Sequence, residues 1–210
     1  MDPWPLRHLV LRTPRLELRP DDDESLHELA ELVTRGVHPP GEMPFISPWT
    51  ELPPGELERG VFQFRWLHRA RFKPEEWNIS FTVRHEGRVI GSQDLSAKDF
   101  AIRREVRSGS WLGLAHQGQG FGTEMRAAVL AFAFDHLGAT TAGSEAFSDN
   151  ARSLGVSRRL GYRENGIRTV IRKGEAATEI GLRLTREEFR RPDWTVQVEG
   201  LDGCRSMLGI

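Results

Sequence analysis

The segment from Ser110 to Thr123 combines residue types that can hold a phosphate group. It is predicted to form the end of a strand, then a turn with glycine at 118, 120 and 122, and then a long helix. Because glycine lacks a Cβ atom, such a turn can bring several backbone N–H groups together beside the positive end of the helix. We therefore predict a seat for a phosphate or pyrophosphate here. The alternative is a tight turn without a ligand, which is common between strands and helices.

Two common phosphate-binding motifs do not fit this turn. A nucleoside triphosphatase loop needs Gly-Lys-Ser/Thr at the helix start, and the residues here are Gly122-Thr123-Glu124. A dinucleotide fingerprint needs the spacing G-x-G-x-x-G, which the glycines do not have, and the chain is too short for a second Rossmann half after the turn. A nicotinamide-dependent oxidoreductase remains only as a weaker alternative.

The elements that must position this turn follow from hydrophobic periodicity and from capping residues. In chain order we predict a strand in the segment Leu9–Pro20, ended by proline, and then a helix capped within 21–23 that carries Leu26 to Val33. A proline-rich loop at 39–54, a helix at 56–72, and a hairpin of Asn78–His85 and Val89–Leu95 follow. The remaining predicted elements are a strand at Ser108–Leu114, a helix at Thr123–Leu137, a strand at Thr140–Phe147, a helix at Asn150–Leu160, and strands at Ile167–Arg172 and Glu179–Leu184. This order predicts the α+β class, with a central mixed sheet flanked by helices.

One domain is expected, comprising residues 1–190 and followed by a C-terminal extension at residues 191–210. Within the extension, Thr195–Glu199 alternates like a strand. This strand is compatible with packing on the sheet of its own chain or on a second copy, so a homodimer or higher homo-oligomer stays open.

The loop at 39–54 holds six of the 12 prolines of the chain, together with Met43, Phe45, Ile46 and Trp49. Proline fixes φ and removes a hydrogen-bond donor, which favours an ordered, non-helical loop. Its apolar residues argue against a flexible linker. We interpret it as a lid or pocket wall, and simple packing over the core is the alternative.

Composition excludes several classes of protein. In 210 residues, Lys+Arg 29 against Asp+Glu 30 gives a net charge of −1, without the basic excess of a nucleic-acid binder. No apolar run is long enough to cross a membrane. The single Cys204 excludes an internal disulfide and a cysteine zinc site, and the seven histidines show no metal-ligand spacing. We expect a cytoplasmic protein that binds no metal, nucleic acid or membrane.

Three motifs resemble one known family. Gln117-x-x-Gly120-x-Gly122 resembles the Q/R-x-x-G-x-G/A signature with which the GCN5-related N-acyltransferases, the GNAT superfamily, bind the pyrophosphate of coenzyme A. Leu11-x-Thr-x-Arg-Leu-x-Leu-Arg19 is similar to the opening strand of its RimJ/RimL-type branch, which acylates protein N-termini and small amines. Asn150-Ala-Arg-Ser153, followed by Leu160-Gly161-Tyr162, resembles that branch's second motif.

The resemblance implies a division of roles among the site residues. The strand before the glycine turn would splay from its neighbour and offer its backbone at Leu112 and Leu114 to the pantetheine arm and the acyl carbonyl. Ser153 would give a proton to the leaving thiolate. Asn150 would bind the pantetheine amides, cap a helix, or do both. The pyrophosphate would be held by Gln117, Gly118, Gly120, Gly122 and Thr123.

The base that removes the amine proton is not identified. Where some relatives carry a glutamate, the nearest residue here is Arg172. Three further candidates for the base are Asp94, Glu145 and His116. A residue of these types is more often a surface or structural residue than a base, and loss of the proton through a water molecule would need none of them. The only tyrosine, Tyr162, occupies a packing position of the motif.

The implied function is an N-acyltransferase that moves an acyl group from acyl-coenzyme A to a primary amine by direct attack in a ternary complex. The amine is a protein N-terminus, a lysine or a small molecule. The co-substrate is acetyl-CoA or succinyl-CoA, because the proline-rich loop also resembles that of a succinyltransferase subgroup, with His38, Ser47, Thr50 and Lys98 as candidate partners for a carboxylate. A non-catalytic coenzyme A-binding or sensor module on the same fold is the alternative.

Overall fold

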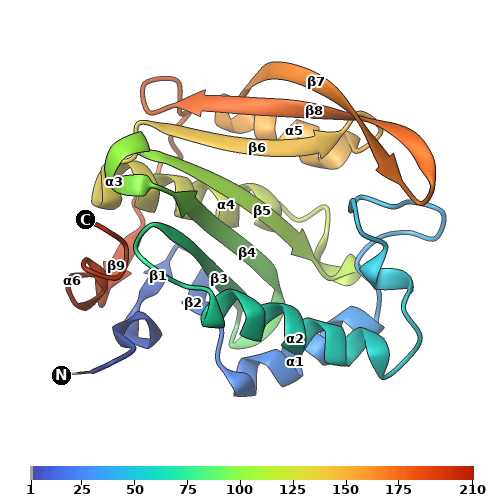
Figure 1. Cartoon of the computed structure of the whole chain (residues 1–210), viewed down its shortest axis with the longest axis horizontal. Helices are drawn as coiled ribbons and strands as arrows, with labels where there is room; N and C mark the ends of the chain where they lie inside the picture. The colour runs from blue at the N-terminus through green and yellow to red at the C-terminus, as the bar shows by residue number, and fades with distance from the viewer. Residues whose placement is uncertain (1) are drawn as a thin grey trace.

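A nine-stranded sheet runs through residues 2–210, the part of the chain that the computed structural model describes (Figure 1). The strands are β1 (Val10–Arg12), β2 (Leu16–Pro20), β3 (Glu76–His85), β4 (Arg88–Lys98), β5 (Glu105–Leu112), β6 (Thr141–Phe147), β7 (Arg163–Arg172), β8 (Glu175–Thr185) and β9 (Gln197–Glu199). Their order in the sheet is β7-β8-β6-β5-β4-β3-β2-β1-β9. Of the neighbouring pairs, β5 and β6 are parallel and the others antiparallel, which confirms a mixed, mostly antiparallel α+β fold.

Helices cover both faces of this sheet. The longer ones are α1 (Asp23–Thr34), α2 (Glu56–Ala70), α4 (Phe121–Ala131), which continues as the π-helix η4 (Phe132–Leu137), and α5 (Ala151–Leu160). The short ones are η1 (Pro5–His8), η2 (Trp49–Glu51), α3 (Phe100–Arg103), η3 (Leu114–His116) and α6 (Leu201–Cys204). The helices α1 and α2 pack together on one face, and α4 and α5 pack on the other (Figure 1).

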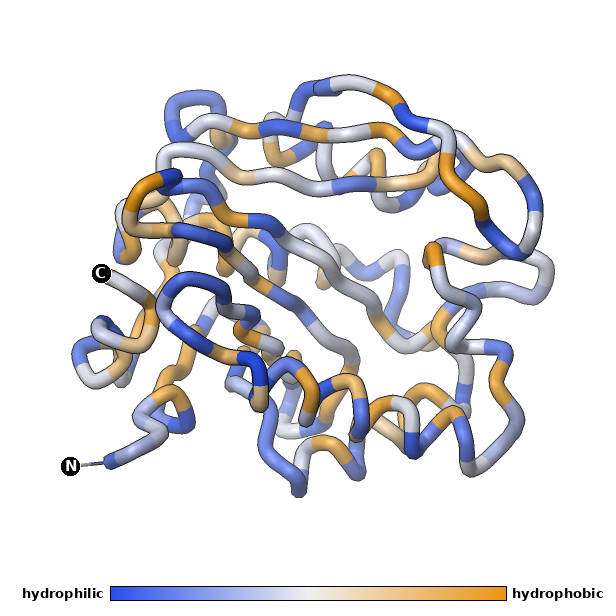
Figure 2. The backbone as a smooth tube through the Cα atoms, viewed as in Figure 1, coloured by the Kyte–Doolittle hydropathy of each residue, from blue (hydrophilic) through white to orange (hydrophobic). Residues whose placement is uncertain are grey.

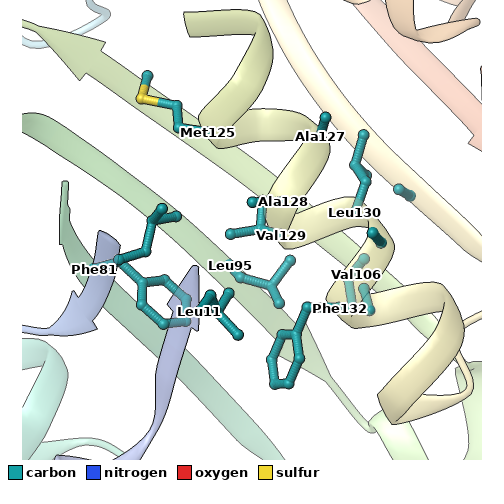
Figure 3. Close-up of a cluster of buried hydrophobic side chains, with 14 of the residues drawn as sticks. Leu11, Phe81, Leu95, Val106, Met125, Ala127, Ala128, Val129, Leu130 and Phe132 are labelled. Atoms are coloured by element: carbon teal, nitrogen blue, oxygen red, sulfur yellow. The ribbon is translucent and has the colours of Figure 1, made fainter. Parts of the chain in front are cut away.

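The main core lies between the sheet and α4 (Figure 3). From the strands, Leu11, Phe81, Leu95 and Val106 point toward the helix, and all four are fully buried. The helix contributes a run of buried residues from Met125 to Phe132 to this core. This burial fixes the start of α4, and therefore the glycine turn before it, against the rigid sheet.

Capping residues predicted several helix ends correctly, although α4 begins at Phe121 rather than Thr123 and α2 ends at Ala70 rather than Phe72. The Asp22 carboxylate accepts a hydrogen bond from the Ser25 N–H at 2.7 Å and caps α1. Gly138 ends the α4–η4 helix with φ +78° and Gly161 ends α5 with φ +99°, both in the left-handed region that favours glycine.

Strand ends were predicted less well. The hairpin strands β7 and β8 are longer than predicted, because the extra residues pair through the backbone and have no apolar alternation; β7 is exposed along most of its length. The predicted strand Ser108–Leu114 begins earlier and ends at Leu112. The helix α3 was not predicted.

The C-terminal strand lies on the sheet of its own chain. β9 pairs antiparallel with β1, with Leu11 opposite Val198. The indole N–H of Trp77 donates to the Leu208 carbonyl at 3.1 Å, and Leu201, Cys204 and Leu208 are buried in the main core. Of the two arrangements open for residues 195–199, the structure therefore adopts the one within a single chain.

Hydrophobic and hydrophilic residues are interspersed along the chain (Figure 2). Within residues 2–210, no helix combines the length and the apolar character needed to cross a lipid bilayer.

Candidate functional site

The parallel strands β5 and β6 separate after a short paired stretch. They pair only where Glu105–Arg107 faces Thr141–Gly143. Beyond this point β5 stays paired with β4 up to Leu112, and β6 stays paired with β8 up to Phe147. Each strand is therefore held by its outer neighbour while the two diverge (Figure 1). The splay expected from the family resemblance is confirmed.

Backbone groups of β5 face this gap. The Gly113 N–H donates to the Ile90 carbonyl at 2.9 Å. Because only alternate residues of an antiparallel strand bond to the neighbouring strand, Leu112 and Ser110 direct their N–H and C=O groups away from β4, toward the gap. The Leu112 carbonyl already accepts from the Gln117 side chain at 3.0 Å. The N–H groups of Ser110 and Leu112 are thus the donors directed into the gap.

The expectation for Leu114 is wrong. Leu114 lies beyond the strand in η3, where its N–H donates to the Gly36 carbonyl at 2.9 Å and its C=O accepts from the Gln117 N–H at 3.3 Å. Both backbone groups are engaged, and Leu114 does not line the cavity described next. The sequence prediction extended the strand by two residues, so it placed the pair of free amides two residues too late.

A cavity of about 860 Å³ passes through the gap between β5 and β6. On the α4–α5 side it is lined by the glycine turn, Thr123, Asn150 and Ser153; in the gap by Ser108, Ser110, Leu112 and Ser144; and on the α1–α2 side by Trp49, Phe64, Asp94 and Trp111. A long ligand can therefore lie along α4 and α5 and present one end to the opposite face of the sheet.

The glycine turn leaves its amides free at the start of α4. Gly118 and Gly120 have φ +76° and +84°. Across the described chain, the N–H groups of residues 118–122 find no acceptor, and the first N–H groups of α4 that do are those of Thr123 and Glu124, which donate to the Gly120 carbonyl. Converging free amides at the N-terminus of a helix form a site for an anion. The five predicted residues from Gln117 to Thr123 all line the cavity.

Sequence reasoning missed Arg15 at this turn. Its Nη1 donates to the Gln119 carbonyl at 3.0 Å, its Nε donates to the buried Glu124 carboxylate at 2.6 Å, and its guanidinium lies over the Phe121 ring. A guanidinium, itself paired with Glu124, is therefore fixed beside the free amides. No local signal links residues separated by more than a hundred positions.

Gln117 holds the site together through its side chain. Its Nε2 donates to the Val37 carbonyl at 2.8 Å as well as to the Leu112 carbonyl. The amide thereby ties the segment after α1 to the end of β5, which fixes the width of the cavity at this point.

Asn150 and Ser153 begin α5 beside the gap. The Asn150 Oδ1 accepts from the Ser153 N–H at 3.0 Å, so the helix-capping role is present. The Asn150 Nδ2 and the Ser153 hydroxyl have no hydrogen-bond partner among residues 2–210. Both groups are therefore free to contact a ligand in the cavity.

A buried cation, Arg126, also lines the cavity. Its guanidinium is bonded to the Ser157 and Ser110 hydroxyls at 2.9 and 3.2 Å, and its Nε has no partner. Burial lowers the pKa of Arg126, because desolvation disfavours the charged form. None of the carboxylates in the described chain forms an ion pair with it, which leaves a buried positive charge open to an anion.

Tyr162 is a packing residue. It is buried in the main core and does not line the cavity. Burial raises the pKa of Tyr162 above its usual value, because the phenolate would be desolvated. A hydroxyl enclosed in this way cannot reach a leaving group in the cavity.

The proline-rich loop forms one wall of the cavity, as predicted, with Pro44, Phe45, Ser47 and Trp49 among its lining residues. Arg172, on the opposite side of the gap, donates to the Met43 carbonyl at 2.9 Å, and Lys173 pairs with Glu51 at 2.7 Å. The loop thus bridges from α1 to the β7–β8 hairpin.

The structure places the residues suggested as partners for a succinyl carboxylate in different surroundings. The His38 ring is engaged by the Thr50 hydroxyl at 2.8 Å and by the Pro39 carbonyl at 3.0 Å. Lys98 is exposed at the far end of β4 and does not line the cavity, so its suggested role is wrong. Ser47 lines the cavity but brings no charge.

Residues 15–163 match a model of the acetyltransferase (GNAT) domain family. This match spans more than half of the chain and includes the glycine turn, α4 and α5.

Solved structures share the fold at low sequence identity. The chain is similar to Mycobacterium smegmatis RimJ in complex with a CoA disulfide (TM-score 0.71, 17% identity, 89% of this chain and 91% of that one). It is also similar to RimL, a ribosomal L7/L12 alpha-N-protein acetyltransferase in complex with coenzyme A (TM-score 0.66, 18% identity, 82% and 95%). A third is the Microcin C7 self-immunity acetyltransferase with acetyl-CoA and AMP (TM-score 0.64, 13% identity, 82% and 93%).

Proposed function

Because this chain belongs to the GNAT acetyltransferase family, we propose that it transfers an acyl group from acyl-coenzyme A directly to a primary amine within a ternary complex. The observation that carries the proposal is the cavity between β5 and β6, which has free amides on one face of the sheet and an open approach on the other. Two substrates that enter from opposite faces can meet in such a cavity.

The coenzyme would lie on the α4–α5 side. The free amides of residues 118–122, with the Thr123 hydroxyl and the Arg15 guanidinium, suit a pyrophosphate. The Leu112 N–H and the Asn150 amide suit the pantetheine arm. The Ser110 N–H would donate to the thioester carbonyl, and its bond would strengthen as negative charge develops on that oxygen.

Turnover on an amine tests this function. Purified protein is mixed with acetyl-CoA or succinyl-CoA and a panel of acceptors, and the free thiol is measured. A peptide with a free N-terminus is the first acceptor, since RimL is an alpha-N-protein acetyltransferase; N-acetyl-lysine amide and spermidine represent the other amine classes. Coenzyme binding without turnover on any amine would favour the sensor module, and affinity for NAD instead of coenzyme A would favour the oxidoreductase.

We further propose that the acyl group is succinyl. A succinyl chain ends in a carboxylate, which an enclosed pocket must pair with a cation. Arg126 supplies a buried guanidinium that lines the cavity beside Ser110 and has only hydroxyl partners. An acetyl group would leave that charge unpaired.

With the same amine, the wild-type protein is therefore expected to have a higher kcat/KM for succinyl-CoA than for acetyl-CoA. The Arg126→Gln variant is expected to lose about tenfold more kcat/KM with succinyl-CoA than with acetyl-CoA. The reason is that only the succinyl carboxylate loses its partner. Steady-state kinetics with both thioesters measures this. A wild-type preference for acetyl-CoA above about tenfold, or about 1.4 kcal/mol in transition-state binding, would contradict the succinyl assignment and leave the transferase function intact.

A further inference from the structure

Two acidic residues flank a glycine on the face of the sheet opposite the coenzyme side. Asp94 on β4 is paired with Gly109 on β5. Gly109 lies two residues past Arg107, which faces Gly143, and Glu145 lies two residues past Gly143. Since side chains two residues apart point to the same face, Asp94, Gly109 and Glu145 form a row across β4, β5 and β6. All three line the cavity, and no atom lies within 4 Å of where a Gly109 side chain would begin.

Asp94 is held in place by a buried arginine. The Arg65 Nη1 donates to the Asp94 Oδ1 at 2.8 Å, and the Arg65 Nη2 donates to the Ser92 hydroxyl at 2.6 Å. Arg65 is only 4% exposed and also faces Asp21 at 3.7 Å. The Asp94 Oδ2 has no hydrogen-bond partner within residues 2–210, and a quarter of the side chain is exposed, on the wall of the cavity.

Charge distinguishes Asp94 from Glu145. Arg65 and Arg69 are shared among Asp21, Asp23 and Asp94, so this network has three carboxylates for two guanidinium groups and one negative charge in excess. Glu145 is bound by Arg107 and faces Arg168, which also pairs with Glu179; that network is balanced. A cation entering the cavity is therefore attracted to Asp94.

The position of Asp94 suits an attacking amine. Gly109, its neighbour across the strand pair, immediately precedes Ser110, whose N–H faces the gap where the thioester carbonyl would lie. Because Gly109 has no side chain, no side chain at position 109 stands between Asp94 and that point. The approach is lined by aromatic residues, among them Trp49, Phe64 and Trp111.

We propose that Asp94 forms the ammonium-binding subsite for the acceptor and removes its proton, with Arg65 as a positioning residue; this rests on the proposed function. One proton of the ammonium group passes to the Asp94 carboxylate and then to solvent. The neutral nitrogen forms a bond to the acyl carbon, and the carbon–sulfur bond breaks as the Ser153 hydroxyl gives its proton to the sulfur. Ser153 regains a proton from the nitrogen, so the coenzyme leaves as a thiol and the product is a neutral amide. The acceptor class is an amine that is positively charged in solution.

Asp94→Asn tests the subsite, because asparagine retains the size of the side chain and an oxygen for Arg65. We expect kcat/KM for the amine to fall at least a hundredfold, about 2.7 kcal/mol, as for loss of a general base. The dissociation constant of the acyl-CoA, measured by calorimetry, should stay within about twofold. Arg65→Lys should lower kcat more than it raises KM, because it keeps the charge but loses the fixed geometry.

Glu28→Gln is the matched control. Glu28 on α1 pairs with Arg84 at 2.5 Å and does not line the cavity, so its variant should keep wild-type kinetics. If the wild-type protein turns over the amine and Asp94→Asn keeps kcat/KM within about threefold of the wild-type value, the subsite is overturned and the proposed function stands. An equal loss of coenzyme binding in Asp94→Asn would also overturn it. Absence of turnover by the wild-type protein on every amine would overturn both.

Discussion

Gly120→Val is expected to weaken acyl-CoA binding about a hundredfold, equivalent to about 2.7 kcal/mol. Gly120 has φ +84°, a conformation that a β-branched residue adopts only with strain. A Cβ atom built there would lie 3.3 Å from the Arg15 guanidinium. Either the turn or Arg15 must shift, and both changes disperse the groups that converge on the pyrophosphate. Titration calorimetry with coenzyme A measures the effect.

Gly174→Val is the matched control for this variant. Gly174 has φ +82° in the β7–β8 hairpin, with no atom within 4 Å of its Cβ position, and it does not line the cavity. It should share the backbone strain of Gly120→Val, and hence a lowered Tm, while coenzyme affinity stays unchanged. Unaltered coenzyme affinity in a folded Gly120→Val protein would remove the glycine turn from the proposed pyrophosphate site.

Features encoded by neighbouring residues were predictable from the sequence. The glycines at 118, 120 and 122 and the helix that follows lie within one short segment, and so do Asp22 with α1 and Asn150 with α5. In each case the residue that ends or begins an element contacts residues three or four positions away, so the pattern can be read directly.

Features that depend on distant contacts were not predictable. The end of β5 is set by the Gly113–Ile90 and Leu114–Gly36 hydrogen bonds, and this shifts the free amides from Leu114 to Ser110. Asp94 was considered as a base without a reason to prefer it. Its distinguishing features, the buried Arg65 and the excess charge of the network, join three separate segments of the chain.

Arg126 shows the same limit in a different form. In the sequence it is one polar residue within an apolar helix, which on average points to solvent. In the structure it faces the gap because α4 must bury Met125 and Val129 against the sheet and the helix then turns Arg126 toward Ser110 and Ser157. Hydrophobic periodicity identified the helix but not the surroundings of its polar side.

Ser153→Ala is expected to lower kcat about a hundredfold and to leave the dissociation constant of the coenzyme nearly unchanged. The hydroxyl lines the cavity and makes no hydrogen bond within the described residues, so its removal costs little stability. Its proposed task, protonating the sulfur as the carbon–sulfur bond breaks, arises only in the transition state, and such proton transfers typically contribute a hundredfold or more. Single-turnover kinetics together with calorimetry separates the two quantities.

Ser148→Ala is the control for this variant, because Ser148 is exposed just before α5 and does not line the cavity. It should keep the wild-type kcat. The Ser153→Ala measurement distinguishes proton transfer from the alternative role, in which Ser153 only contacts the coenzyme. That role predicts weaker coenzyme binding with kcat unchanged at saturation, since a contact made equally in the ground state and in the transition state affects only binding. Such a result would reassign the proton transfer to water in the cavity, because the hydroxyl of Tyr162 is enclosed in the core and cannot replace Ser153.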